Sequence, residues 1–140
     1  MYLISNINLA SNLPIVVVGC GGTGSLVAEG LCRLFLDRPE VNVVLVDMDR
    51  VEAHNIARQN FHPGEVGRFK TEALAQRLSQ AYGREISYST SPWSNGVYKD
   101  IFMQQPAPNM VALSSGLIIG CLDNAPARAA VLETLTTGFT

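Results

Sequence analysis

The sequence predicts an α/β fold with a doubly wound, mainly parallel sheet, and three observations lead to this prediction. Residues 15–18 form an uninterrupted apolar run that leads directly into the glycine-rich turn GCGGTGS at residues 19–25. Residues 41–46 form a second, valine-rich run, as expected for a strand that is covered on both faces of a sheet. Between these runs, apolar residues recur at helical spacing, so the segment reads as strand, turn, helix and strand.

Two amphipathic helices are predicted from the spacing of their apolar residues. A helix from Ser25 has apolar residues at i, i+4, i+7 and i+8, the spacing of one buried face, and residues 37–39 (DRP) end it. The same spacing recurs in a helix that begins at Lys70 and ends at Gly83, a residue suited to a left-handed C-terminal cap.

The remaining segments complete the sheet. Residues 85–89 read as a third strand, and residues 117–121 read as a fourth strand followed by a helix with Pro126 in its first turn. Residues 92–108 are expected to form a long connection with a short helical piece. The residues expected to pack in this connection are Trp93 and Tyr98.

Length and composition fit one domain. The chain has 140 residues, of which 47% are hydrophobic, so it can bury a core. We expect an N-terminal arm at residues 1–14, either an edge strand or a dimer arm, and a nucleotide-binding domain at residues 15–140. The formal net charge of -2 gives no electrostatic reason to expect a nucleic acid partner.

Sorting signals and metal-ligand patterns are absent from the sequence. The first eighteen residues carry no Lys, Arg, Asp or Glu, and no apolar stretch approaches the roughly 20 residues of a membrane span. We therefore expect a soluble, cytoplasmic protein with no membrane partner. Cysteines and histidines have no metal-ligand spacing, so we expect buried thiols and polar loop or helix residues. These residues are Cys20, Cys32, Cys121, His54 and His62.

The glycine-rich turn is a candidate phosphate-binding loop, because the following helix directs its positive end at the same place. By itself, the pattern Gly19-x-Gly21-x-x-Gly24 also occurs in domains that bind NAD, FAD, S-adenosylmethionine or ATP. Asp47 lies at the carboxyl end of the second strand, where such folds place an acid that accepts hydrogen bonds from ribose. Aspartate is also a common turn former. Together, the turn and the acid favour a nucleoside phosphate.

The segment after the second strand separates the nucleotide classes. On a short helix, Asn55 and Arg58 would share a face, and Lys70 opens the next helix against its dipole. An amide, a guanidinium and an ammonium suit a triphosphate and its leaving pyrophosphate, whereas a dinucleotide seldom needs them. The plain alternative for Arg58 and Lys70 is a solvated surface charge.

Asp123 and Asn124 follow the fourth strand. Asp123 would suit a magnesium ion, because magnesium is held by one or two carboxylates together with phosphate oxygens and water. The plain alternative is that the two residues cap the next helix.

Taken together, these motifs resemble the family of ATP-dependent adenylyltransferases that includes ThiF, MoeB, HesA and the ubiquitin-activating enzymes. The matching pieces follow that family's order and approximate spacing over residues 15–128. They are GCGGTGS at 19–25, D-x-D-x-V at 47–51, N-x-x-R-Q at 55–59, G-x-x-K at 67–70 and D-N-x-x-x-R at 123–128. The segment NIARQNF at 55–61 looks most like the ThiF-type proteins of bacterial mobile-element (PRTRC-type) clusters.

This resemblance implies a Rossmann-like domain that takes part in adenylation. The C-terminal carboxylate of a small ubiquitin-like or sulfur-carrier protein with a Gly-Gly tail would attack the α-phosphate of ATP, and pyrophosphate would leave. Relatives are dimers, so a homodimer is expected. The resemblance gives the ribose to Asp47, the triphosphate to Asn55, Arg58 and Lys70, and Mg²⁺ to Asp123, with Arg58, Lys70 and Asp123 as catalytic residues. The nucleotide-binding positions that it implies are Gly19, Gly21, Gly22, Thr23, Gly24, Asp47, Asp49, Asn55, Arg58, Gln59, Lys70, Asp123 and Asn124.

The chain departs from the family pattern in two respects. Many relatives bring an arginine from an N-terminal segment onto the triphosphate, yet no Arg or Lys precedes Gly19. Many also carry a thioester-forming cysteine and zinc-binding cysteines further along than Thr140, so we expect the domain to be incomplete at its C-terminal end. Two alternatives therefore stay open: a non-catalytic partner subunit of an activating heterodimer, and an NAD-binding oxidoreductase domain.

Overall fold

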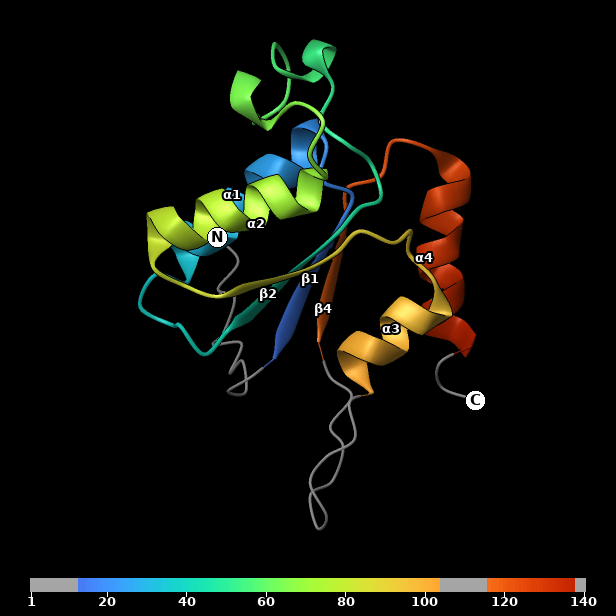
Figure 1. Ribbon diagram of the computed structural model, residues 1–140. Coiled ribbons are helices and arrows are strands. Elements are labelled where there is room, and N and C mark those ends of the chain that lie inside the picture. Colours follow the sequence, from blue (N-terminus) through green and yellow to red (C-terminus); the bar gives the residue numbers. More distant parts are fainter. Residues whose placement is uncertain (1–12, 104–115, 138–140) are drawn as a thin grey trace, which may run out of the picture.

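The computed structural model describes residues 13–103 and 116–137 (Figure 1). Its strands are β1 Pro14–Val18, β2 Asn42–Val46, β3 Ile86–Ser89 and β4 Leu117–Gly120. Its α-helices are α1 Gly22–Leu34, α2 Lys70–Tyr82, α3 Asn95–Phe102 and α4 Ala125–Thr137.

The four strands form one all-parallel sheet in the order β3-β2-β1-β4. Val16 of β1 is in register with Val44 of β2 on one side and with Ile118 of β4 on the other. The chain moves outward from β1 to β3 through α1 and α2, and it then returns to place β4 on the opposite side of β1. The predicted doubly wound α/β fold is confirmed, and its winding direction reverses between β1 and β4, where folds of this kind bind ligands.

Helices cover both faces of the sheet (Figure 1). Ile15 and Val17 of β1 pack in the core beneath α1 and α2, whereas Val16 and Val18 pack on the other face against α3 and α4. These four side chains are at most 2% exposed. Burial on both faces is the reason why β1 reads as an unbroken apolar run in the sequence.

The predicted helices are confirmed, with small differences at their ends. α1 begins at Gly22, three residues before the expected start at Ser25, and no acidic residue lies in its first turn. α2 begins at Lys70 and is closed by Gly83 in the left-handed conformation (φ 60°), as predicted. Neither helix, nor any other among the described residues, is long and apolar enough to cross a membrane.

Most of the expected N-terminal arm, residues 1–14, lies outside the described residues. Pro14 itself already belongs to β1 and is in register with Asn42 of β2. The assignment of residues 1–14 to an arm therefore stays a prediction.

The chain between β2 and α2 forms a small lobe with two short 3₁₀ helices, Ala53–Asn55 and Pro63–Glu65. The prediction of one short helix that carries Asn55 and Arg58 on the same face is wrong. The 3₁₀ helix ends at Asn55, and Arg58 lies in the turn that follows.

Candidate functional site

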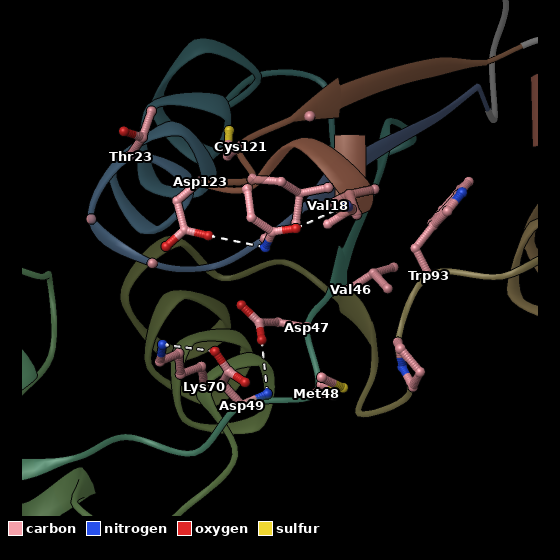
Figure 2. Close-up of a pocket in the computed structure, with 18 of the residues that line it drawn as sticks. Val18, Thr23, Val46, Asp47, Met48, Asp49, Lys70, Trp93, Cys121 and Asp123 are labelled. Carbon is pink, nitrogen blue, oxygen red and sulfur yellow. Dashed lines mark hydrogen bonds and ion pairs between the residues drawn. The ribbon is translucent and has the colours of Figure 1, made fainter. Parts of the chain in front are cut away.

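A cavity of about 660 Å³ lies over the carboxyl ends of β1, β2 and β4. It opens at the point where the winding of the sheet reverses. Figure 2 shows that Asp47, Lys70 and Asp123 surround it, with Trp93 on the opposite side. Residues from β1, the glycine turn, the ends of β2 and β4, the start of α2 and the chain after β3 therefore meet in one place.

Two glycines of the turn are required by the fold itself. Gly19 has a φ of 92°, which favours glycine, and a Cβ there would lie 2.7 Å from the carbonyl oxygen of Cys121. A Cβ on Gly24 would lie 1.7 Å from the carbonyl oxygen of Gly19, so α1 can approach β1 only because residue 24 is glycine. Gly24 does not line the cavity, although it was predicted to bind phosphate. Its role in the structure is to let α1 pack closely against the turn.

The cavity side of the turn is formed by Gly21, Gly22 and Thr23. Thr23 is exposed in the first turn of α1, and the first backbone amides of a helix have no partner within that helix. The positive end of the helix dipole acts at the same spot. This part of the cavity is therefore suited to an anion.

Asp47 joins the end of β2 to the glycine turn. Its Oδ2 accepts a hydrogen bond of 2.6 Å from the backbone amide of Cys20, and its Oδ1 accepts one of 2.8 Å from the amide of Asp49. Each carboxylate oxygen keeps a second lone pair, and the side chain lines the cavity. Asp47 is thus both a brace for the turn and an acceptor that a ligand can reach.

Lys70 is 7% exposed and faces the cavity from the first turn of α2. Its Nζ lies 3.4 Å from Oδ2 of Asp49, and its backbone amide donates to the Asp49 carbonyl at 2.9 Å. A lysine in the first turn of a helix is opposed by the helix dipole, which suggested that an anion binds there. In the structure, the carboxylate of Asp49 already supplies one negative charge beside Lys70. That carboxylate is on a side chain that is 59% exposed.

Asp123 and Asn124 have separate roles. Asn124 caps α4, because its Oδ1 accepts from the amide of Ala127 at 2.9 Å and its carbonyl accepts from Arg128 at 3.2 Å. Asp123 is exposed and lines the cavity, and within residues 13–103 and 116–137 it accepts only from the side chain of Asn124, at 3.3 Å. The capping alternative is therefore right for Asn124, while the carboxylate of Asp123 faces the cavity.

Asn55 and Arg58 do not line the cavity, in contrast to the prediction that they converge there. Asn55 is 3% exposed, and its Oδ1 accepts a 2.8 Å hydrogen bond from the amide of Glu52, so its side chain is used to cap the 3₁₀ helix. The side chain of Arg58 is exposed. Only its backbone is near the turn, with the carbonyl oxygen 3.4 Å from where a Cβ on Gly22 would lie.

Gln59 does line the cavity, and it lies against the glycine turn. Its Oε1 is buried without a hydrogen-bond partner among the described residues. The next residue fixes this segment, because the amide nitrogen of the Asn60 side chain donates to Glu29 at 3.0 Å and the Asn60 carbonyl accepts from Arg77 at 2.6 Å. Gln59 is therefore held over the turn.

An apolar wall that the sequence did not reveal closes the other side of the cavity. It is formed by Met48, Pro92 and Trp93. Trp93 is held in place from α4, where Oγ1 of Thr134 accepts the indole hydrogen bond at 2.9 Å. The position of Trp93 soon after β3 was a usable signal, since the carboxyl ends of parallel strands meet at one edge.

The cysteines behave as buried thiols rather than nucleophiles. Cys20 and Cys32 are fully buried, and Cys121 is partly exposed where it lines the cavity. Burial, with the nearby carboxylate of Asp47, raises the pKa of the Cys20 thiol far above its ordinary value, and burial also raises that of Cys121. The part of the chain that the structure describes holds no group of three or more His, Cys, Asp and Glu side chains that could bind a metal.

Comparison with known proteins agrees with this geometry. The family model described as "ThiF family" matches residues 7–136. Ubiquitin-like modifier-activating enzyme 5 of Oryza sativa subsp. japonica is 32% identical over 136 residues, which cover 94% of this chain and 31% of that protein. The enzyme of the same name from Dictyostelium discoideum is 29% identical over 135 residues, covering 94% and 34% respectively.

One solved structure is similar to this chain both in fold and in sequence. It is the E. coli tRNA N6-threonylcarbamoyladenosine dehydratase TcdA in complex with ATP, with a TM-score of 0.67 and 25% identity, covering 91% of this chain and 49% of that chain. The chain spans about a third of the length of the curated relatives it matches. The family model matches nearly the whole length of this chain, so the chain belongs to the ThiF family.

Proposed function

We propose that this chain is the nucleotide-binding part of an enzyme that uses ATP to adenylate a carboxylate. One observation carries the proposal: the glycine turn, the ammonium of Lys70 and the carboxylate of Asp123 all face a single cavity. An anion-binding turn, a cation for phosphate charge and a carboxylate for a metal are the groups that chemistry at the α-phosphate of ATP needs. The ATP complex of TcdA supports the same nucleotide.

The phosphates are assigned to the glycine side of the cavity. The backbone amides at Gly21 and Gly22 and the positive end of α1 lie there. Lys70 would exchange the carboxylate of Asp49 for a phosphate oxygen when the nucleotide enters. The backbone of Arg58 lies beside Gly22, and its side chain has no partner among the described residues. The long side chain is therefore free to turn toward the triphosphate.

The nucleoside is assigned to the other half of the cavity. Asp47 offers the remaining lone pairs of its carboxylate to the ribose hydroxyls. The purine then lies along the apolar wall, where the ring of Trp93 and the side chain of Met48 provide an apolar surface. This orientation directs the α-phosphate between the base and Lys70.

The donor set fits a magnesium ion that is shared with the nucleotide. Magnesium keeps water and phosphate oxygens in its shell and needs only one or two protein carboxylates, and Asp123 supplies one at the cavity. A magnesium ion at Asp123 would neutralise phosphate charge. Asn124, occupied in capping α4, holds the backbone of Asp123 in position.

The proposed reaction joins a substrate carboxylate to AMP. A carboxylate oxygen attacks the α-phosphorus, the bond from that phosphorus to the bridging oxygen breaks, and pyrophosphate leaves with the negative charge. No side chain forms a covalent bond, so the residues act by holding and orienting the phosphates. The names of the curated relatives support a ubiquitin-like protein as the substrate. A C-terminal Gly-Gly tail on that protein is part of our proposal.

The test is ATP–pyrophosphate exchange by the full-length gene product with a ubiquitin-like partner. We expect exchange that requires magnesium and an intact Gly-Gly tail, and a fall of at least 100-fold in Asp123→Asn. Asn124→Ser is the matched control, because serine can still cap α4, and it should retain exchange. Exchange that loses nothing in Asp123→Asn would contradict the assigned role of that carboxylate.

Other results would select another function. Exchange with a tRNA bearing N6-threonylcarbamoyladenosine, and none with a Gly-Gly-tailed protein, would keep adenylation and overturn the protein substrate. Magnesium-dependent ATP binding with no exchange for any carboxylate would favour a non-catalytic partner subunit. Binding of NADH without ATP binding would overturn the proposal.

A further inference from the structure

A carboxylate in α1 that does not line the cavity accepts hydrogen bonds from three side chains. It belongs to Glu29, in the middle of the helix. Its Oε1 accepts from the hydroxyl of Tyr82 in α2 at 2.9 Å and from Arg33 at 2.9 Å. Its Oε2 accepts at 3.0 Å from the side-chain amide of Asn60, which lies 31 residues further along the chain. The two oxygens therefore connect α1 to two different parts of the protein.

Asn60 attaches the lobe between β2 and α2 to both of these helices (Figure 1). Besides the bond to Glu29, its backbone amide donates to Oγ of Ser25 in α1 at 3.4 Å. Its carbonyl accepts from Arg77 of α2 at 2.6 Å, and Arg77 is itself held by Glu65 at 2.9 Å. The residue that directly follows the N-x-x-R-Q motif is therefore fixed through its side chain and its backbone.

The segment that ends at Asn60 lies against the glycine turn. The carbonyl oxygen of Arg58 is 3.4 Å from where a Cβ on Gly22 would lie, and Nε2 of Gln59 is 3.8 Å from the corresponding place on Gly21. The buried Oε1 of Gln59 has no partner among the described residues, so it does not fix that side chain. Consecutive Cα atoms are 3.8 Å apart, so a displacement of Asn60 would also move Gln59 and Arg58.

The charge on Glu29 strengthens its bond to Asn60. Hydrogen bonds from Arg33, and then from Tyr82 and Asn60, hold the pKa of Glu29 below its usual value, so the side chain is a carboxylate at neutral pH. A hydrogen bond from an amide to a carboxylate is charge-assisted, and such bonds are stronger than those between neutral groups. Among the contacts of Asn60, the one with Glu29 is therefore a strong anchor.

We propose that Glu29 is a positioning residue for nucleotide binding, which acts through Asn60 to hold Gln59 and the backbone of Arg58 over the phosphate side of the cavity. The inference rests on the proposed function, because that function assigns the glycine turn to the phosphates of ATP. Loss of Glu29 should weaken the binding of the phosphates and leave the nucleoside half of the cavity unchanged. A carboxylate that only stabilised the fold would not distinguish between the two halves.

The first test compares the binding of ATP and adenosine to the full-length protein by calorimetry. We expect Glu29→Ala and Asn60→Ala each to weaken ATP binding about tenfold and to leave adenosine binding unchanged. Tyr82→Phe is the matched control, because it removes a bond to Oε1 of Glu29 and keeps the bond from Asn60 to Oε2. It should lower thermal stability without changing the affinity for ATP. Wild-type ATP affinity in Glu29→Ala, or an equal loss in Tyr82→Phe, would overturn the proposal.

Two further variants test whether Glu29 acts through Asn60. Glu29→Gln keeps one oxygen that can accept from the Asn60 amide, and it should recover most of the ATP affinity that Glu29→Ala loses. The double variant Glu29→Ala/Asn60→Ala should lose no more ATP affinity than either single variant, because both substitutions remove the same contact. Additive losses would mean that the two side chains act separately, and they would overturn the proposed route.

Hydrogen exchange tests the contact without any nucleotide. In Glu29→Ala, we expect the amides of Arg58, Gln59 and Asn60 to exchange about tenfold faster than in the wild type, because this segment opens more often. The same amides should be unchanged in Tyr82→Phe. Unchanged exchange in Glu29→Ala would overturn the proposal. Faster exchange in a protein whose wild type binds no ATP would support Glu29 as the anchor of the segment and overturn the proposed function instead.

Discussion

The carboxylate of Asp47 accepts a 2.6 Å hydrogen bond from the backbone amide of Cys20, so the end of β2 holds the glycine turn that follows β1. The contact joins residues 27 positions apart in the sequence. It means that the acid expected to bind ribose also fixes the shape of the anion-binding turn. In the proposed nucleotide complex, one side chain therefore couples recognition of the nucleoside to recognition of the phosphates.

Replacing Asp47 with asparagine tests this coupling. An amide has one acceptor oxygen in place of two, so the amide of either Cys20 or Asp49 would lose its partner at a cost of about 1–3 kcal/mol. We expect the free energy of unfolding in urea to fall by that amount and the affinity for ATP to fall at least tenfold. Asp37→Asn, which changes an exposed carboxylate beyond α1, is the control and should do neither.

Lys70→Met tests the ammonium in the cavity. Methionine retains the buried stem of Lys70, and Asp49 can remain solvated because it is 59% exposed, so stability should change little. A hydrogen bond to a charged group contributes about 1.5–3 kcal/mol, which corresponds to a roughly 10- to 150-fold loss of ATP affinity. Adenosine should bind as before. Lys99→Met, on the exposed surface of α3, is the control, and equal losses for ATP and adenosine would contradict the assignment.

Much of the fold could be predicted because it depends on local sequence patterns. The strands are buried runs, and the helices have an apolar stripe. The end of α2 needs a left-handed residue, which Gly83 supplies. Asp123 lines the cavity because it follows the carboxyl end of β4, and Lys70 does so because it opens α2. In a parallel sheet, the carboxyl ends of strands and the first turns of the following helices lie at one edge. Residues whose position follows from topology can be read from the sequence.

Other parts of the site depend on contacts that no local pattern reveals. Asn55 was expected at the triphosphate, but its side chain is used by Glu52 in a 3₁₀ helix that ends earlier than helical spacing suggested. Trp93 was expected only to pack. Its place after β3 indicated this edge of the sheet, but the orientation of its ring depends on a hydrogen bond to Thr134, 41 residues away. Prediction of site residues from the sequence is therefore limited in two ways. A side chain can be used by a nearby backbone group, and a contact can join distant parts of the chain.

Trp93 is the single tryptophan of the chain, so its fluorescence reports on the cavity directly. We expect ATP and adenosine to change its emission to the same extent, because both carry the base that we assign to the surface of the indole. Thr134→Val removes the acceptor of the indole hydrogen bond and should lower the free energy of unfolding by about 1 kcal/mol. It should also weaken adenosine binding a few-fold. Emission that ignores adenosine would contradict the assignment of the base.

The cap of α4 gives a prediction that separates stability from chemistry. Asn124→Ala removes the side-chain acceptor for the amide of Ala127, and loss of an N-terminal cap costs about 1 kcal/mol. We expect the midpoint of urea unfolding to fall while the magnesium dependence of ATP binding is unchanged. In Asp123→Ala, the midpoint of urea unfolding should stay the same, and the magnesium dependence of ATP binding should be lost. A change in the magnesium dependence of Asn124→Ala would mean that Asn124 itself reaches the metal.

The buried thiol of Cys20 should make the protein sensitive to alkaline pH. Because burial raises its pKa in the folded state, the thiol stays protonated there while the unfolded chain loses the proton above about pH 8.5. The stabilising contribution of the raised pKa is complete below that pH, and it is lost as the pH rises further, by up to about 1.4 kcal/mol per pH unit. Urea unfolding at pH 7.5 and pH 10 should therefore show a smaller loss of stability in Cys20→Ala than in the wild type. Equal losses in the two proteins would mean that other groups cause the alkaline sensitivity.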